Sequence, residues 1–327
     1  MQAGTGGDGR GPGGGPSADG GLGVEPPRAL RDLRRFSHAA MATVFEVYAA
    51  HADERYASQA AQAAFALIDR LERELSRFRP NSDIARINHL AAGERTRVSP
   101  STLECLAIAR HLFELTGGAF DVSIGTGLRS LELDLDDVAV RATWSGVQID
   151  LGGIGKGYAV DLAAELLEEW GVDHALVHGG FSSVLALEAP PDQGGWPLTL
   201  SDPATPSRVL ARLSVRQTAI AASGMRKGGH IVDPRSGDAA CGRLAAWVAL
   251  PRPEPARAEA DAADDEGPRL AAAAVADALT TAFMLMGAEE IAGLCARSPG
   301  LEAWIVPEPE SGLPAETALL HFGGPAD

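Results

Sequence analysis

One segment near the C-terminus constrains the fold more than any other. Residues 271–290, AAAAVADALTTAFMLMGAEE, predict a helix that is apolar on nearly all of its sides. Such a helix is unstable on a protein surface, because its apolar side chains would remain in contact with water. We therefore expect this helix to be buried inside the fold.

The other periodic segments indicate a mixture of strands and helices. We expect strands over residues 41–50, 174–180 and 182–189, and helices over residues 57–78, 101–118 and 158–171. These elements do not follow one another as regular strand–helix–strand units. The pattern therefore favours an α+β fold over a doubly wound parallel sheet.

The ends of the chain differ in composition from its middle. With 327 residues, 45% of them hydrophobic, the chain can bury one sizeable core. Residues 1–28 are rich in glycine and proline and predict a disordered tail. We assign residues 29–310 to a single domain and residues 311–327 to a C-terminal tail. Proline and acidic residues predict solvated loops at 251–269 and, near the end of the chain, at 306–316.

Charge and cysteine content exclude several classes of protein. A net charge of −16 argues against a general nucleic-acid binder, which needs a basic surface. The three cysteines are far apart and lack CxxC spacing, so they suggest neither a zinc site nor a disulfide framework. The first 21 residues lack the basic start and the apolar core of a signal peptide, and no segment reaches the roughly 20 apolar residues of a membrane helix. We therefore expect a cytoplasmic protein without membrane insertion.

A glycine-rich stretch, DLGGIGKGYAVD at residues 150–161, suggests an anion site. It is not a P-loop, because Gly157 rather than Ser or Thr follows Lys156, and its GxGxG spacing is a poor match to a dinucleotide fingerprint. Glycine N–H groups, the positive end of the following helix and Lys156 could still bind a phosphate. The alternative is a tight turn that carries a surface lysine.

Other polar residues stand out in apolar surroundings. Asp277 and Thr281 lie four residues apart, so both oxygens leave one face of the predicted helix, as ligands of Mg2+ could. Alternatively, the Thr281 hydroxyl donates a hydrogen bond to a backbone carbonyl of its own helix, and Asp277 forms an ion pair with a buried arginine. His230, in HIVDPRSG, and Asp121, in GGAFDVSIG, each stand beside a turn, where such residues are more often structural.

Taken in order, these motifs resemble the FAD:protein FMN transferases, known as the ApbE family. The resemblance extends from Met41 to about Glu290, and the order of the motifs is far more specific than any one of them. The matching segments are MAT at 41–43, LSRFRPNSDIARIN at 75–88, GGAFDVSIG at 117–125, DLGGIGKGYAVD at 150–161, SG at 223–224, HIVDPRSG at 230–237 and ADALTTAFMLMG at 276–287.

The resemblance implies a T-fold-like, two-lobed mixed α/β domain and an Mg2+-dependent enzyme. Such an enzyme takes FAD as substrate and transfers its FMN half to a Thr or Ser hydroxyl of a target flavoprotein, releasing AMP. The matching positions imply metal binding by the Gly153 carbonyl, Asp277 and Thr281. The positions implied for FAD are Met41, Phe78, Ala119, Phe120, Asp121, Asp150, Lys156, Ser223, His230 and Ile231.

The incoming hydroxyl needs a general base, for which His230 is our first choice and Asp277 our second. The chain also departs from the family pattern. Phe78 replaces a common tyrosine, Phe181 replaces Asn or Asp, and Asp150 follows Asp121 by only 29 positions. Because parts of the site's cover are shortened, two alternatives stay open: an FAD-binding protein without transferase activity, and an Mg2+-dependent FAD diphosphatase that yields FMN and AMP.

Overall fold

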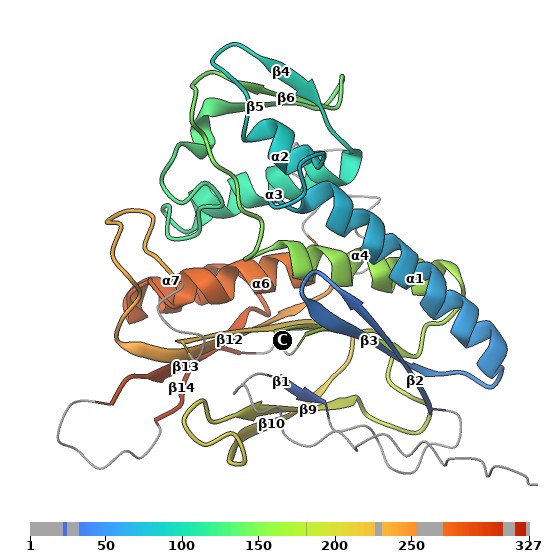
Figure 1. Ribbon diagram of the computed structural model, residues 1–327. Helices are drawn as coiled ribbons and strands as arrows, with labels where there is room; N and C mark the ends of the chain where they lie inside the picture. The colour runs from blue at the N-terminus through green and yellow to red at the C-terminus, as the bar shows by residue number, and fades with distance from the viewer. Residues whose placement is uncertain are drawn as a thin grey trace, which may run out of the picture.

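A computed structural model of the chain describes residues 22–24, 33–180, 182–225, 231–253, 271–309 and 318–324. An antiparallel sheet of eight strands forms the middle layer of the larger lobe (Figure 1). In spatial order the strands are β14 (Leu320–Gly323), β13 (Glu302–Pro307), β12 (Arg243–Pro251), β11 (Thr218–Gly224), β8 (Ser183–Ala186), β7 (Ala175–Gly179), β3 (Thr43–Ala50) and β2 (Leu33–Ala40). The strands expected over residues 174–180 and 182–189 are present as β7 and β8, which pair antiparallel.

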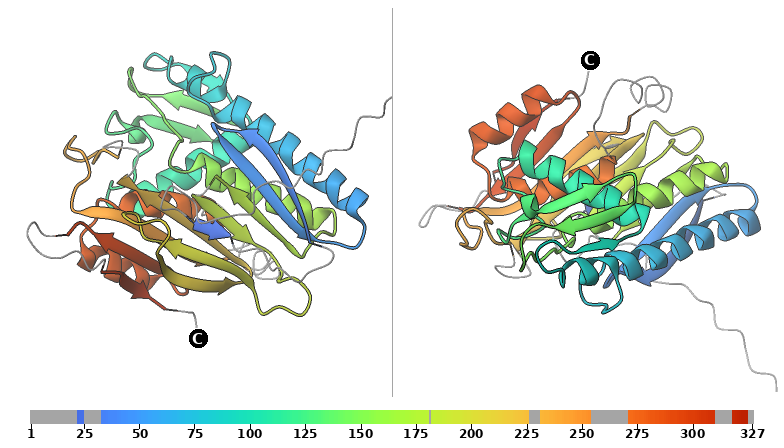
Figure 2. Two further views of the ribbon diagram at one scale, coloured as in Figure 1. Left: turned by 60° about the horizontal axis from the view of Figure 1, so that its bottom comes forward. Right: turned by 90° about the horizontal axis from the view of Figure 1, so that it is seen from above.

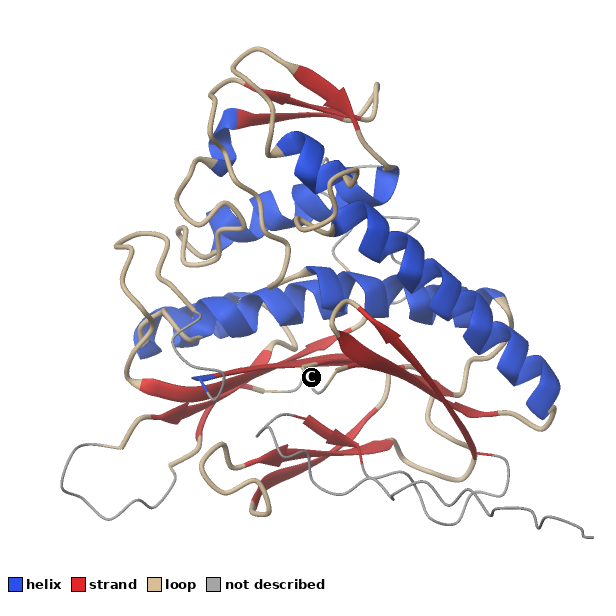
Figure 3. Cartoon of the chain, viewed as in Figure 1, coloured by secondary structure: helices blue, strands red, loops and turns tan. Residues whose placement is uncertain are grey.

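Helices cover one face of this sheet (Figure 3). They are α1 (Glu54–Leu75), α4 (Gly155–Glu169), α6 (Ala272–Phe283) and α7 (Ala288–Arg297). Within α6 every residue is buried except Thr281, which is partly exposed. The predicted burial of this apolar helix is therefore confirmed. Its one partly exposed residue, Thr281, is a predicted metal-binding residue.

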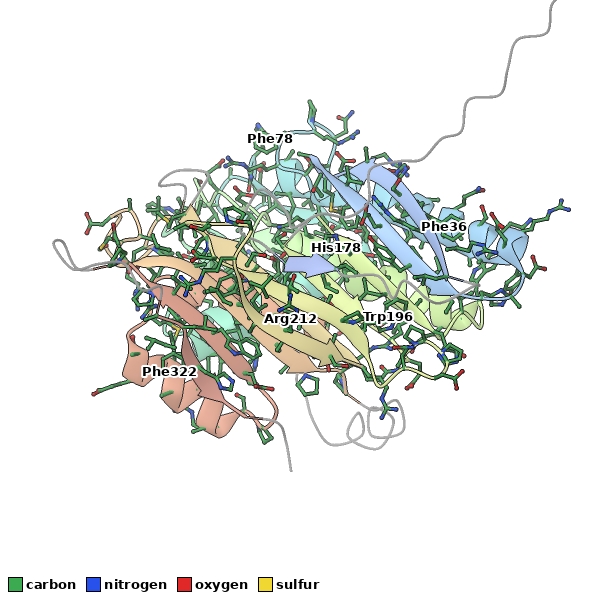
Figure 4. The ribbon with its side chains drawn as sticks, turned by 90° about the horizontal axis from the view of Figure 1, so that it is seen from below. Phe36, Phe78, His178, Trp196, Arg212 and Phe322 are labelled. Carbon is green, nitrogen blue, oxygen red and sulfur yellow. The ribbon has the colours of Figure 1, made fainter. Side chains whose placement is uncertain are left out.

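A three-stranded sheet covers the opposite face of the larger sheet (Figure 2). Its strands are β1 (Leu22–Val24), β9 (Trp196–Ser201) and β10 (Val209–Val215). Side chains of β9, among them Trp196 and Leu198, pack with Ile220 and Trp247 of the larger sheet in a second apolar core. The two layers form a β-sandwich, and Figure 4 shows Trp196 on this side of the molecule.

The smaller lobe stands above the helical layer, as the two-lobed prediction requires (Figure 1). It contains α2 (Asp83–Ile87), α3 (Pro100–Leu115) and a short 3-10 helix, Leu128–Ser130. Its sheet has the order β4 (Arg95–Arg97), β6 (Ala139–Ala142), β5 (Leu131–Asp134). Antiparallel strands together with a separate helical layer confirm the mixed α+β architecture.

Both predicted tails contribute a strand. Leu22–Val24, within the expected disordered segment, pairs as β1 with β9, and β14, within the expected C-terminal tail, pairs with β13. Of the two predicted loops, residues 254–270 and 310–317 lie outside the described residues. Val306 and Pro307, which we placed in the second loop, instead end strand β13.

Helix boundaries differ from the prediction for identifiable reasons. Helix α1 begins at Glu54 because the Asp53 side chain accepts the N–H of Tyr56, and it ends at Leu75 because Ser76 is extended. Helix α4 begins at Gly155, three residues earlier than expected. Lys156 and Gly157 therefore belong to the first turn of the helix rather than to the loop before it.

The single helix expected over residues 271–290 is wrong in its second half. Helix α6 ends at Phe283, and α7 begins at Ala288 after the cap residue Gly287. The Glu290 carboxylate accepts the N–H of Gly287 at 2.6 Å, which stabilises a new helix start at this position. None of the helices in the described part of the chain has both the length and the apolar character needed to cross a membrane.

Candidate active site

Segments that are far apart in the sequence line one cleft of about 1060 Å3. It receives residues from the β2–β3 turn, the end of α1, the loop after α3, the start of α4 and the middle and last turn of α6. His230 lies outside the described residues, although the next residue, Ile231, is in the cleft wall. The other predicted site residues all line the cleft: Met41, Phe78, Ala119, Phe120, Asp121, Asp150, Gly153, Lys156, Ser223, Ile231, Asp277 and Thr281.

The three predicted metal-binding residues come together in this cleft. Asp277 and Thr281 lie one turn apart on α6, and Gly153 approaches them from the loop before α4. A methyl group placed on Gly153 would be 3.4 Å from the Thr281 hydroxyl oxygen and 3.3 Å from the Phe120 ring. The glycine backbone therefore lies directly against the threonine side chain.

Asp277 is a buried carboxyl held by positive partners. Its Oδ2 accepts the backbone N–H of Gly157 at 3.1 Å and lies 3.4 Å from Lys156 Nζ. Burial raises the pKa of Asp277, whereas Lys156 and the Gly157 N–H act in the opposite direction. These contacts leave the second carboxylate oxygen without a charged partner among the described residues.

The groups around Asp277 fit a hard divalent cation. A carboxylate, a hydroxyl and a backbone carbonyl are the oxygen donors that Mg2+ prefers. The Ser183 hydroxyl on β8 is fully buried, favours the charged form of Asp277 and has no ordinary hydrogen bond within the described structure. No cluster of three or more His, Cys, Asp or Glu occurs in the described ranges, so the remaining ligands would come from the substrate or water.

The glycine-rich stretch acts differently from our expectation at one position. Gly157 does not direct its N–H toward the cleft, because that group donates to Asp277. A side chain at Gly157 would lie 2.2 Å from the backbone oxygen of Ala273, so this glycine permits α4 to contact α6. Lys156 fits the anion-binding hypothesis better: its Nζ donates to Gly152 O at 3.1 Å and lines the cleft at the positive end of α4.

Sequence reasoning missed Arg77. Its Nε lies 3.2 Å from Oδ2 of Asp150, whose other oxygen accepts the N–H of Gly152 at 2.9 Å. The ion pair joins the end of α1 to the glycine-rich stretch across the cleft wall. Arg77 belongs to the motif LSRFRPNSDIARIN, but only the neighbouring Phe78 was singled out from it.

Two further predicted residues have structural partners. The Asp121 carboxylate accepts the backbone N–H groups of Ser123 and Gly125 and the Ser123 hydroxyl, as the structural alternative for this acid implies. The Ser223 hydroxyl lies 2.9 Å from that of Thr280 on α6. Both side chains thereby fix the walls of the cleft.

The β2–β3 turn brings Met41 to the cleft in an unusual conformation. Ala40 pairs with Thr43, and the two residues between them have φ angles of 48° at Met41 and 57° at Ala42. Such two-residue hairpin turns normally contain Asn or Gly, because left-handed angles crowd other side chains. The backbone strain is local to a wall of the cleft.

The chain matches the model of the ApbE family over residues 41–132 and 126–265. The FAD:protein FMN transferase of Treponema pallidum is 26% identical over 296 residues, which cover 76% of each chain. A Vibrio cholerae protein of the same name is 23% identical over 263 residues, 68% of this chain and 72% of its own.

Solved structures share the fold. The apo flavinyl transferase ApbE of Pseudomonas stutzeri superposes with a TM-score of 0.72 at 22% identity, covering 89% of this chain and 94% of its own. The ApbE protein of Thermotoga maritima gives a TM-score of 0.72 at 21% identity, covering 89% and 97%. The family match spans more than half of the chain and contains every motif of the cleft except ADALTTAFMLMG at 276–287, which lies beyond its end. This protein belongs to the ApbE family.

Proposed function

We propose that this protein is an Mg2+-dependent FAD:protein FMN transferase, which moves the FMN half of FAD onto a Thr or Ser hydroxyl of a target flavoprotein and releases AMP. The observation that carries the proposal is the convergence of Gly153, Lys156, Asp277 and Thr281 in one cleft. The names of the similar proteins support flavin transfer as the reaction.

The residues of the cleft suit cleavage of a diphosphate. Asp277, Thr281 and the Gly153 carbonyl would hold Mg2+, which when bound would neutralise charge on the phosphate oxygens. Lys156 donates to Gly152 O and contacts Asp277, so the third hydrogen of its ammonium remains for a phosphate oxygen. The positive end of α4 favours negative charge at the same place.

Asp277 suits metal binding better than proton transfer. Burial raises the pKa of Asp277, with the Lys156 ammonium and the Gly157 N–H acting against it. A bound divalent cation would further favour the charged form, and a carboxylate that holds the ion is not free to take up a proton. We therefore keep His230 as the proposed base for the acceptor hydroxyl. Phe78, an exposed ring in the cleft wall, is suited to stacking on flavin or adenine.

One incubation separates this function from its alternatives. The purified protein is mixed with FAD, Mg2+ and an acceptor flavoprotein domain, and the products are analysed by mass spectrometry. AMP together with an FMN-sized mass increase on the acceptor supports the transferase. AMP without labelling would indicate the diphosphatase, bound FAD without products would indicate a binding protein, and no FAD binding would contradict all three.

Asp277→Ala should abolish both AMP release and acceptor labelling, because it removes the only carboxylate proposed to hold Mg2+. A matched control is Asp83→Asn in the smaller lobe, which alters a buried carboxylate that accepts from Ser99 and Thr102 away from the cleft. The control should retain activity. Full turnover in the Asp277 variant would contradict the metal assignment.

A further inference from the structure

Helix α6 carries two proposed metal ligands but has no capping groups of its own. Its N-cap is Ala271, which makes no side-chain hydrogen bond, and neither its first turn nor its last turn contains a complementary charge. The N–H groups at a helix start need partners when they are buried. The partners of α6 must therefore come from other elements.

Asp161 of α4 supplies the partners at the N-terminal end. One carboxylate oxygen accepts the N–H of Ala273 at 3.0 Å, and the other accepts the N–H of Ala274 at 2.8 Å. The Asp161 side chain is only 3% exposed, so water does not compete for these bonds. At the opposite end, Arg243 of β12 donates to the carbonyl of Phe283. An anion and a cation thus lie at the matching ends of the helix dipole.

The same helix that holds the start of α6 also contacts its metal-binding residue. One turn before Asp161, the Gly157 N–H donates to Asp277, and the Gly157 backbone lies against Ala273. Helices α4 and α6 are therefore joined at two levels, by Asp161 at the start of α6 and by Gly157 at Asp277. Two levels of contact fix both the height and the rotation of α6, whereas one would leave it free to pivot.

We propose that Asp161 is a positioning residue for the metal site: by binding the start of α6, it holds Asp277 and Thr281 in place opposite Gly153 and Lys156. The inference rests on the proposed function only for the identity of the ion. Asp161 lies outside the cleft lining and acts through the helix it caps.

The test is Asp161→Asn, which keeps the shape of the side chain but leaves only one acceptor for two N–H groups. Mn2+ serves as the probe, and its dissociation constant is measured by electron paramagnetic resonance without FAD or acceptor. We expect at least fivefold weaker binding. Asp83→Asn is the matched control, since it removes a buried carboxylate that accepts from Ser99 and Thr102 near the start of α3. It should lower the melting temperature without weakening Mn2+ binding.

A second variant restores the cap from another position. Ala271 has the extended backbone of an N-cap residue, so Ala271→Asp in the Asp161→Asn background should recover Mn2+ affinity. If Asp161→Asn does not fold, Asp161→Glu replaces it: the charge is kept, α6 is displaced by one methylene, and Mn2+ binding should still weaken.

Unchanged Mn2+ affinity in the folded Asp161 variant would overturn the proposal. So would an equal loss in Asp83→Asn, or no recovery with Ala271→Asp. Wild-type protein that binds no Mn2+ would also overturn it. Wild-type protein that binds Mn2+ but transfers no flavin would refute the proposed function alone, because the readout needs neither FAD nor acceptor.

Discussion

At the scale of single residues, Phe78 packs poorly against the rest of the protein but lies where its ring could contact a ligand in the cleft. Its side chain is 81% exposed, yet it lines the cleft and has the Arg77 guanidinium 4.7 Å from its ring centre. Figure 4 shows it at the outer edge of the molecule. An exposed ring contributes little to the core, so covering it with a flat ligand would bury apolar surface that folding leaves in water.

We therefore predict that Phe78→Ala weakens FAD binding between about twofold and tenfold, the range expected for one lost aromatic contact. The free energy of unfolding should hardly change, because so little of the ring is buried. Titration of FAD monitored by flavin fluorescence measures the first effect, and urea denaturation the second. Trp144→Ala is the control: Trp144 is 64% exposed but does not line the cleft. Equal losses of FAD affinity in both variants would contradict the assignment.

At the scale of elements, α4 and α6 meet closely because Gly157 has no side chain. We predict that Gly157→Ala lowers the free energy of unfolding by about 2 kcal/mol or more, since the new methyl group would lie 2.2 Å from a backbone oxygen. In Gly155→Ala, two residues earlier in the same helix, the methyl group has no neighbour nearer than 3.9 Å. That variant should keep its stability or gain up to about 1 kcal/mol from helix propensity. Urea denaturation measures both, and similar values would contradict the close contact.

Helices and strands were predictable from the sequence where capping residues mark their ends or where apolar residues repeat along one face. Helix α1 has its buried residues, among them Ala64, Ile68 and Leu71, at the expected spacing. The segment that contains α6 is apolar on nearly all sides, so its spacing contains no signal for the end at Phe283, and only Gly287 interrupts the apolar run before α7. Strands β5 and β6 have four residues each, too few to establish an alternating pattern.

At the scale of the whole molecule, the order of motifs predicted which segments meet, but not how they contact one another. Met41 and Asp277 lie in the same cleft although most of the chain separates them. The ion pair of Arg77 with Asp150 and the contact of Asp161 with α6 join different motifs. Such long-range pairs depend on the packing of complete helices and sheets, which local spacing does not encode.

Two buried groups in different layers give the stability opposite dependences on pH. Burial raises the pKa of Asp161 to about 7, although Arg252 and the N–H groups of α6 act against it and Glu165 adds to it. Burial lowers the pKa of His178 to about 4, with Arg35 acting in the same direction and Glu46 and the backbone of Leu22 against it. Figure 4 shows His178 beside β1.

The signs follow from proton uptake. Between about pH 4 and 7, folded Asp161 binds a proton that the unfolded chain has released, so its contribution to stability falls as pH rises. Between about pH 4 and 6.5, unfolded His178 binds a proton that the folded protein does not, so its contribution rises with pH. The two shifts correspond to roughly 4 and 3 kcal/mol, and they oppose each other in the wild-type protein.

Removing either titrating group should therefore make the pH dependence contributed by the other one visible. We predict that the free energy of unfolding of Asp161→Asn rises more steeply with pH between pH 4.5 and 6.5 than that of the wild type. For His178→Gln we predict the opposite: the difference between its free energy of unfolding and that of the wild type becomes more negative as the pH rises over the same interval. Urea denaturation at one-unit steps from pH 4.5 to 8.5 measures these slopes. Above about pH 7.5 both groups have released their protons in either state, so the three curves should run parallel there. Parallel curves below pH 6.5 would show that neither group titrates differently in the folded and unfolded chain.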